Sequence, residues 1–109
     1  MAGTMVYAIT IKTSTTYDTN TNLSGRIGIV KDGVLIISST INQSGSGRIR
    51  VCEGGALIVD GGALLNANIT MIPGSTLILK NNGRISMAPG WSFYAPKGVV
   101  VKIESGEII

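Results

Sequence analysis

Histidine is absent from this chain of 109 residues, and cysteine occurs once, as Cys52. Without histidine, the chain cannot build a histidine-based catalytic triad, a histidine general base or a histidine-ligated zinc or iron site. A single cysteine excludes an internal disulfide and a cysteine-cluster metal site, and within a predicted strand it is interpreted as a small apolar residue. We therefore expect no metal site and no cofactor.

Charge is also scarce. Charged residues make up 14% of the chain, and the formal net charge is +3. The basic residues are scattered, and Arg48 and Arg50 form the only close pair. Nucleic-acid-binding domains typically carry a basic stripe interleaved with aromatic residues, so we expect no nucleic-acid partner. The longest apolar runs, such as Val34–Ile37, are far shorter than the roughly twenty residues of a membrane-spanning helix, so we expect no membrane insertion.

What the chain does contain is a repeat. Residues of the same kind recur at intervals of about 22 positions, which is typical of stacked structural repeats. The aliphatic columns of this repeat are Ile27/Ile49/Ile69/Phe93, Ile29/Val51/Met71/Ala95, Leu35/Leu57/Leu77/Val101, Ile37/Val59/Leu79/Ile103 and Ile41/Leu64/Ile85/Ile108. The turn columns are Asp32/Gly54/Gly74/Gly98 and Ser39/Gly62/Gly83/Gly106.

Each repeat contains short alternating strands separated by glycine-rich turns, and no window keeps a helical period. A β-sandwich or barrel would also have short strands, but its hairpins give no reason for one coil length. We therefore predict an all-β, single-stranded right-handed parallel β-helix (β-solenoid) of about four coils of about 22 residues over residues 26–109. Residues 4–12 are predicted to form an N-terminal strand, and residues 13–25 a loop or irregular cap. Residues 1–25 and 26–109 together form one domain.

Three segments carry a resemblance. Residues 17–27 (YDTNTNLSGRI) resemble an entry segment ending in L-S/T-G-D-I, residues 48–62 (RIRVCEGGALIVDGG) resemble I-x-V-x-x-G-G-x-L-x-V-D-G-G, and residues 83–91 (GRISMAPGW) resemble G-x-I-x-L-x-P-G-F. The chain is thus similar to parallel β-helix domains of large secreted and surface proteins of Gram-negative bacteria. Arg26 replaces the usual acidic residue and Trp91 the usual Phe. The resemblance implies an extracellular or envelope location and transfers no catalytic residue.

Catalysis is not expected. A polysaccharide-cleaving β-helix needs carboxylates clustered on one outer face, with calcium or a basic catalyst. Asp32 and Glu53 share a turn, but Pro73 and Gly98 occupy that turn in the following coils, so no column of acids forms. We predict that the chain is not an enzyme and has no catalytic residue.

One outer face is predicted to be apolar. If Leu35 and Ile37 point inward, their neighbours point outward, because successive side chains of a strand alternate. A contiguous apolar surface usually indicates a partner, so we predict self-association or docking of a protein partner there. The residues of this predicted interface are Val34, Ile36, Ala56, Ile58, Ile78 and Val100.

Two aromatic residues offer an alternative. Trp91 follows a Pro-Gly turn and Tyr94 should point outward, so together they are a candidate platform for a glycan. The predicted function is a non-catalytic structural or protein-interaction module, and the alternative is a carbohydrate-binding or carbohydrate-active module.

Rows of threonine for ice or mineral binding do not repeat from coil to coil. Because the C-terminal residues 107–109 carry no polar cap, end-to-end stacking or continuation in a longer protein is also expected.

Overall fold

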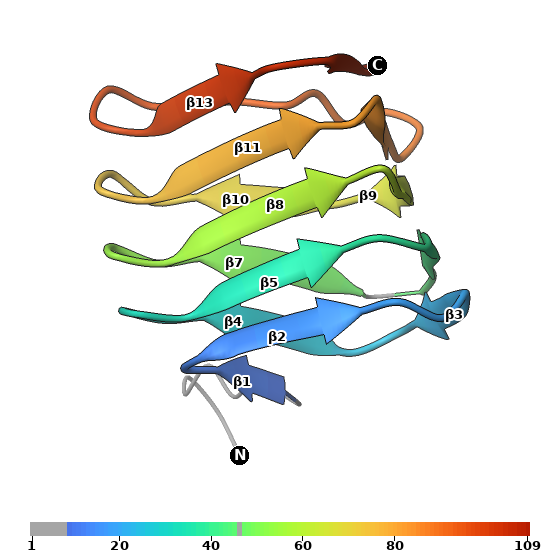
Figure 1. The fold of residues 1–109 in the computed structure, drawn as a ribbon, viewed down its shortest axis with the longest axis horizontal. Coiled ribbons are helices and arrows are strands. Elements are labelled where there is room, and N and C mark those ends of the chain that lie inside the picture. The colour runs from blue at the N-terminus through green and yellow to red at the C-terminus, as the bar shows by residue number, and fades with distance from the viewer. Residues whose placement is uncertain (1–8, 46) are drawn as a thin grey trace.

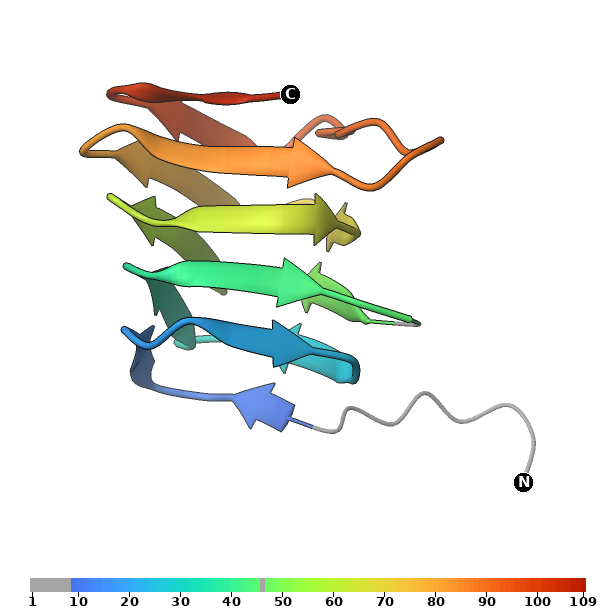
Figure 2. The ribbon, with the colours of Figure 1, turned by 90° about the vertical axis from the view of Figure 1, so that its right-hand side faces the viewer.

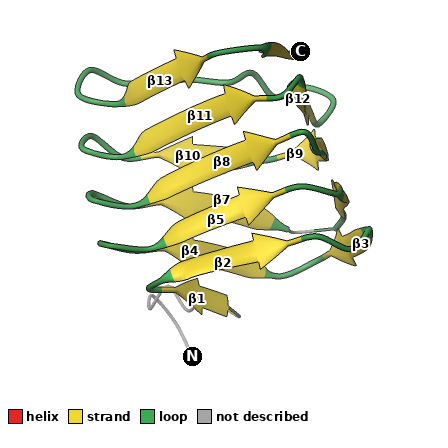
Figure 3. Cartoon of the chain, viewed as in Figure 1, coloured by secondary structure: helices red, strands yellow, loops and turns green. Residues whose placement is uncertain are grey.

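The computed structural model describes residues 9–45 and 47–109. In these residues every regular element is a β-strand, and the strands wind upward as a parallel β-solenoid of about five turns (Figure 1; Figure 3). Each full winding contributes one strand to each of three parallel sheets. The first sheet contains β1 (Ile9–Ile11), β4 (Arg26–Ile29), β7 (Arg48–Val51) and β10 (Ile69–Met71). The second contains β2 (Ser14–Tyr17), β5 (Val34–Ile37), β8 (Ala56–Asp60), β11 (Thr76–Lys80) and β13 (Val100–Ile103). The third contains β3 (Thr21–Leu23), β6 (Thr40–Gln43), β9 (Ala63–Ala67), β12 (Gly83–Met87) and β14 (Gly106–Ile108).

The winding is right-handed, as predicted. In Figure 1 the chain runs from left to right along the front strands, passes behind on the right and returns from right to left while it climbs. This is the hand that nearly all crossovers between parallel strands adopt.

The strand register confirms the predicted columns except at Phe93 and Ala95, which lie in no strand. Ile27 pairs with Ile49 and Ile49 with Ile69, so identical side chains lie above one another. Leu57 likewise pairs with Leu35 below and Leu77 above. These side chains are buried in one continuous aliphatic core that no single winding could form alone.

The backbone geometry of the first turn column accounts for its residue types. Asp32, Gly54, Gly74 and Gly98 all have positive φ angles, of 68°, 80°, 91° and 96°. The backbone N–H of each of the first three donates to the carbonyl oxygen of the next, over 2.8–3.1 Å. Glycine adopts positive φ without steric cost and aspartate tolerates it, so these residue types allow the turns to stack.

The prediction for residues 13–25 was wrong. Instead of a loop or irregular cap, they contain β2 and β3, which complete a first winding together with β1. Their polar sequence lacks aliphatic alternation, but β-branched threonine suits strands and pairing with β5 and β6 fixes the register. The solenoid therefore has about five turns rather than four. The predicted strand over residues 4–12 can be followed only from Ile9, because residues 1–8 lie outside the described part.

The column Ile27/Ile49/Ile69/Phe93 does not continue as a strand at its fourth member, Phe93. Residues 92–95 form no strand, and the first sheet ends at β10. Phe93 is half-buried and packs against the core, whereas Ala95 is exposed. Pro89 and Pro96 flank this segment, and proline cannot donate a hydrogen bond to a parallel ladder.

Candidate functional site

The predicted apolar interface lies on the outer side of the second sheet. Ile36, Ile58 and Ile78 follow one another in register on β5, β8 and β11. They are half-buried, as are Val34 and Ala56, because each side chain is partly covered by its neighbours in adjacent windings. Val100 and two ion pairs lie at the border of this apolar face. Val100 is 57% exposed, and the ion pairs Lys80–Asp60 (3.9 Å) and Lys102–Glu104 (3.6 Å) border it.

The two aromatic residues of the predicted glycan platform have different surroundings. Both are exposed, Trp91 at 54% and Tyr94 at 72%. Trp91 lines a pocket, and Tyr94 is not among the residues that line it. The structure therefore supports only Trp91 as part of a concave site.

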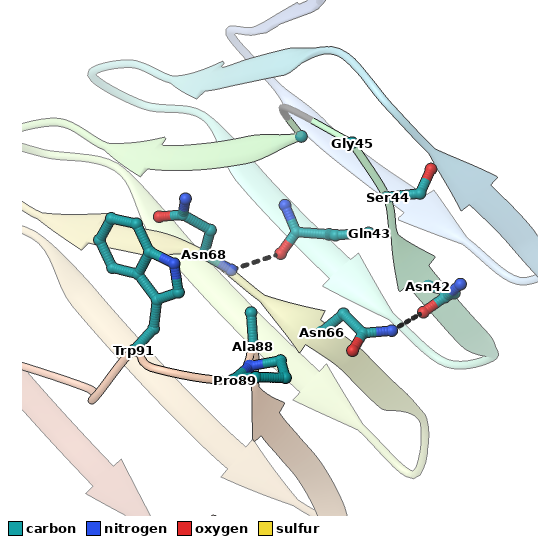
Figure 4. A pocket seen from close by; sticks show the side chains of 10 residues that line it. Asn42, Gln43, Ser44, Gly45, Asn66, Asn68, Ala88, Pro89 and Trp91 are labelled. Atoms are coloured by element: carbon teal, nitrogen blue, oxygen red, sulfur yellow. Dashed lines mark hydrogen bonds between the residues drawn. The ribbon is translucent and has the colours of Figure 1, made fainter.

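This pocket, here called the corner pocket, has a volume of about 360 Å³. It lies at the corner where the chain passes from the third sheet to the first. Its lining residues are Asn42, Gln43, Ser44, Gly45, Gly47, Asn66, Asn68, Ala88, Pro89 and Trp91 (Figure 4).

Unequal coil lengths create the corner pocket. Five residues separate Gln43 from Ile49 at the corner of the second winding, and five separate Met87 from Phe93 at the corner of the fourth. At the third winding Asn68 alone separates Ala67 from Ile69. The longer corners project beyond the shorter one, as the green and orange segments of Figure 2 show. A hollow is therefore left between them.

Gln43 lies at the base of this hollow. It occupies an inward position in register with Leu23 and is only 3% exposed. Its Oε1 accepts a hydrogen bond from the backbone N–H of Asn68 at 3.0 Å (Figure 4). Because a backbone N–H can only donate, the oxygen must face Asn68, and this fixes the orientation of the carboxamide.

The other end of the same carboxamide has no partner within residues 9–45 and 47–109. Gln43 Nε2 is buried and makes no hydrogen bond among the described residues. Leaving a buried donor unpaired typically costs about 1–3 kcal/mol. A residue that bears such a cost while lining a pocket is a candidate ligand-binding group.

Asparagine side chains form the walls beside Gln43. Asn66 has a positive φ of 52° and lies at an irregularity in the pairing of β9 with β12. Its Nδ2 donates to Asn42 Oδ1 at 2.6 Å, which joins two adjacent windings. This bond engages one end of each amide, so Asn66 Oδ1 and Asn42 Nδ2 remain for a ligand.

The chemistry of the corner pocket is neutral. Its lining contains amides, one hydroxyl, small residues and one indole, and no side chain that titrates near neutral pH. Burial raises the pKa of Tyr17 above its usual value, but Tyr17 lies on β2 and does not line the corner pocket. The arrangement can bind by hydrogen bonding and stacking, and it offers no acid or base for catalysis.

Other features give no alternative site. Within residues 9–45 and 47–109, no group of histidine, cysteine or carboxylate side chains is arranged to hold a metal ion. Cys52 is half-buried and lies just after β7 rather than within it. The described part of the chain has no helix that is long and apolar enough to span a membrane.

The sequence predicted Trp91 but not the amides beside it. Two signals were available. The Ile27/Ile49/Ile69/Phe93 column has unequal spacings of 22, 20 and 24 residues, which show that one coil is short. Gln43 also places a polar side chain in an inward column.

Comparison with known proteins adds no further assignment. No family model matches the chain, and neither a curated protein nor a solved structure shows significant similarity to it.

Proposed function

We propose that the chain is a non-catalytic binding module that takes an uncharged glycan in the corner pocket. The observation that carries the proposal is Gln43 Nε2, which is buried and has no partner among the described residues, at the base of an amide-lined hollow beside exposed Trp91. Ligand pockets typically combine apolar or aromatic walls with a few polar groups that fix orientation, and volumes of 300 Å³ or more are usual.

Sugars suit this chemistry. Each sugar hydroxyl both donates and accepts hydrogen bonds, and so does each amide of Asn42, Asn66 and Asn68. A hydroxyl oxygen placed beside Gln43 Nε2 would relieve the unpaired donor. The flat indole of Trp91 supplies an apolar surface for the less polar face of a sugar ring, while its N–H can remain in contact with water.

Two substitutions test the pocket. Trp91→Ala removes the exposed indole, and Gln43→Glu keeps an oxygen for the Asn68 N–H while it removes the donor at Nε2. A glycan array first identifies a neutral oligosaccharide that binds the chain. We expect each substitution to raise the dissociation constant of that oligosaccharide by about tenfold or more in calorimetric titration. Tyr94→Ala is the matched control, because it removes an exposed aromatic side chain outside the pocket.

The stability of the Gln43→Glu variant must be checked by circular dichroism, because a buried charge is costly. Trp91→Ala changes an exposed side chain and should fold normally. Unchanged affinity in both folded variants, or a loss as large in Tyr94→Ala, would refute the assignment.

A second candidate function rests on the second sheet. Ile36, Ile58 and Ile78 form a flat apolar column across three windings, bordered by charged residues. We propose that a second copy of the chain packs against this face, because a flat, regular sheet is complementary in shape to another such sheet. Ile58→Lys should convert a dimer into a folded monomer in light scattering, whereas Thr70→Lys on the first sheet should not. A monomeric wild-type chain at high concentration would contradict this.

The location of the protein belongs to the same proposal. Similarity of residues 17–27, 48–62 and 83–91 to β-helix domains of secreted and surface proteins supports a secreted or cell-surface bacterial protein. A binding module for neutral glycans would meet its ligands in that setting. Fractionation of the native host with an antibody against the chain tests this location, and recovery only from the cytoplasm would contradict it.

A further inference from the structure

We infer that the corner pocket is one subsite of a groove along the solenoid axis, here called the axial groove. Its ligand is a linear, neutral oligosaccharide that crosses several windings. This inference rests on the proposed function and specifies the length and direction of the ligand. It starts from a second hollow on the same side of the molecule.

The second hollow has a volume of about 300 Å³ and lies at β3 and β6. Asn42 lines both this hollow and the corner pocket, so the two hollows adjoin at this residue. The residues that line the second hollow are Asn20, Thr21, Asn22, Thr40 and Asn42.

The register gives the direction of the combined groove. Asn22 pairs with Asn42 across adjacent windings, and Asn66 bonds to Asn42 from the winding beyond. Trp91 and Ala88 belong to the corner of the next winding again. Since neighbouring strands lie about 4.8 Å apart, the path from Asn22 to the level of Ala88 covers three steps, or roughly 14 Å. This is longer than one sugar ring and fits a short chain of rings.

The polar groups along this path are suited to hydroxyls. Asn20 Oδ1 already accepts the Thr40 N–H at 2.8 Å, which holds the Asn20 side chain in place. The exposed amide of Asn22 makes no hydrogen bond within the described part of the chain, so both its ends are available. Free donors and acceptors thus recur at successive windings, as a repeating ligand requires.

Charge distinguishes this groove from a third hollow on the described surface. Neither hollow is lined by a charged side chain. A third hollow, at β12 and β14, is lined by Arg84 and Glu107. A polyanionic chain would find no cation in the axial groove to offset the cost of removing its charges from water, so the groove favours neutral chains.

Chain length provides the test. Calorimetric titration of the full chain with neutral series of one to six sugars (cello-, chito-, malto-, xylo- and manno-oligosaccharides) should identify a series that binds. In that series we expect the dissociation constant to fall by at least about tenfold between the monosaccharide and the tetrasaccharide or longer members. Asn22→Ala should abolish this gain while the monosaccharide affinity stays unchanged, and Thr70→Ala on the first sheet should change neither.

The outcomes separate the two proposals. Equal affinity at every chain length, or a full gain retained in Asn22→Ala, overturns the axial groove and leaves the corner pocket as a single-sugar site. Binding weakened by about tenfold or more in Trp91→Ala, together with the expected rise of affinity with chain length in the wild type, supports both. If no member of any series binds, the proposed function fails, and the axial groove fails with it.

Discussion

Leu57 lies at the centre of the stacked core, and shortening it tests how the core is built. Its side chain is fully buried, and it pairs in register with Leu35 below and Leu77 above, which are also fully buried. Leu57→Ala would remove apolar atoms between two fixed neighbours, so the cavity could not collapse easily. Leucine-to-alanine changes in cores cost about 2–5 kcal/mol, and this site should lie in the middle of that range, at about 3–4 kcal/mol.

The next residue along the strand provides the control. Ile58 belongs to the same strand and winding but points outward and is half-buried. Ile58→Ala should cost less, about 1 kcal/mol, because Ile58 is partly exposed and its removal leaves no enclosed cavity. The free energies of unfolding come from urea denaturation followed by circular dichroism, with the dependence on urea checked for constancy. Equal losses for Leu57→Ala and Ile58→Ala would refute the alternation of inward and outward residues.

Three further predictions concern packing, pH and the corner pocket. Gly83→Ala should destabilise the fold by about 2–3 kcal/mol in the same urea assay, because its added Cβ would clash with the backbone carbonyl oxygen of Val59; a neutral effect would contradict the packing of β12 on β8. Burial raises the pKa of Tyr17, so the folded state holds this proton more tightly than the unfolded state, and the stability present below pH 10.0 should fall as pH rises further. Tyr17→Phe should reduce that fall in thermal melts, and an identical alkaline profile would count against it. Glycan affinity should stay constant between about pH 5 and about pH 9, because no titratable side chain lines the corner pocket; a bell-shaped profile in calorimetry would contradict a neutral site.

The core could be predicted from the sequence because a solenoid places the same type of aliphatic residue at the equivalent inward position of successive coils. Ile49 and Leu57 recur with equivalents one coil before and after, and parallel stacking brings equivalents together. The first winding was missed because Thr15 and Thr16 of β2 give no aliphatic period, and their strand conformation depends on pairing with β5. The local sequence pattern of residues 14–17 does not contain this pairing with β5, which is a tertiary contribution to the strand conformation.

The corner pocket was harder to predict for a different reason. It arises from differences between coils, whereas repeat detection depends on what coils share. Gln43 looks like one polar residue among many until its inward direction and the short corner at Asn68 are known together. Trp91 was chosen for its aromatic type and its place after a Pro-Gly turn, and Tyr94 was grouped with it although Trp91 lines the pocket and Tyr94 does not.

The central claim is that Gln43 and Trp91 bind one ligand together, and side-chain resonances report on this directly. In heteronuclear NMR of the ¹⁵N-labelled chain, a neutral oligosaccharide should shift the Gln43 side-chain amide pair and the Trp91 indole N–H along the same saturation curve. The Tyr94 backbone amide, outside the pocket, should move less. If the Gln43 amide stays unperturbed while the sugar saturates another surface, the corner pocket is not the binding site.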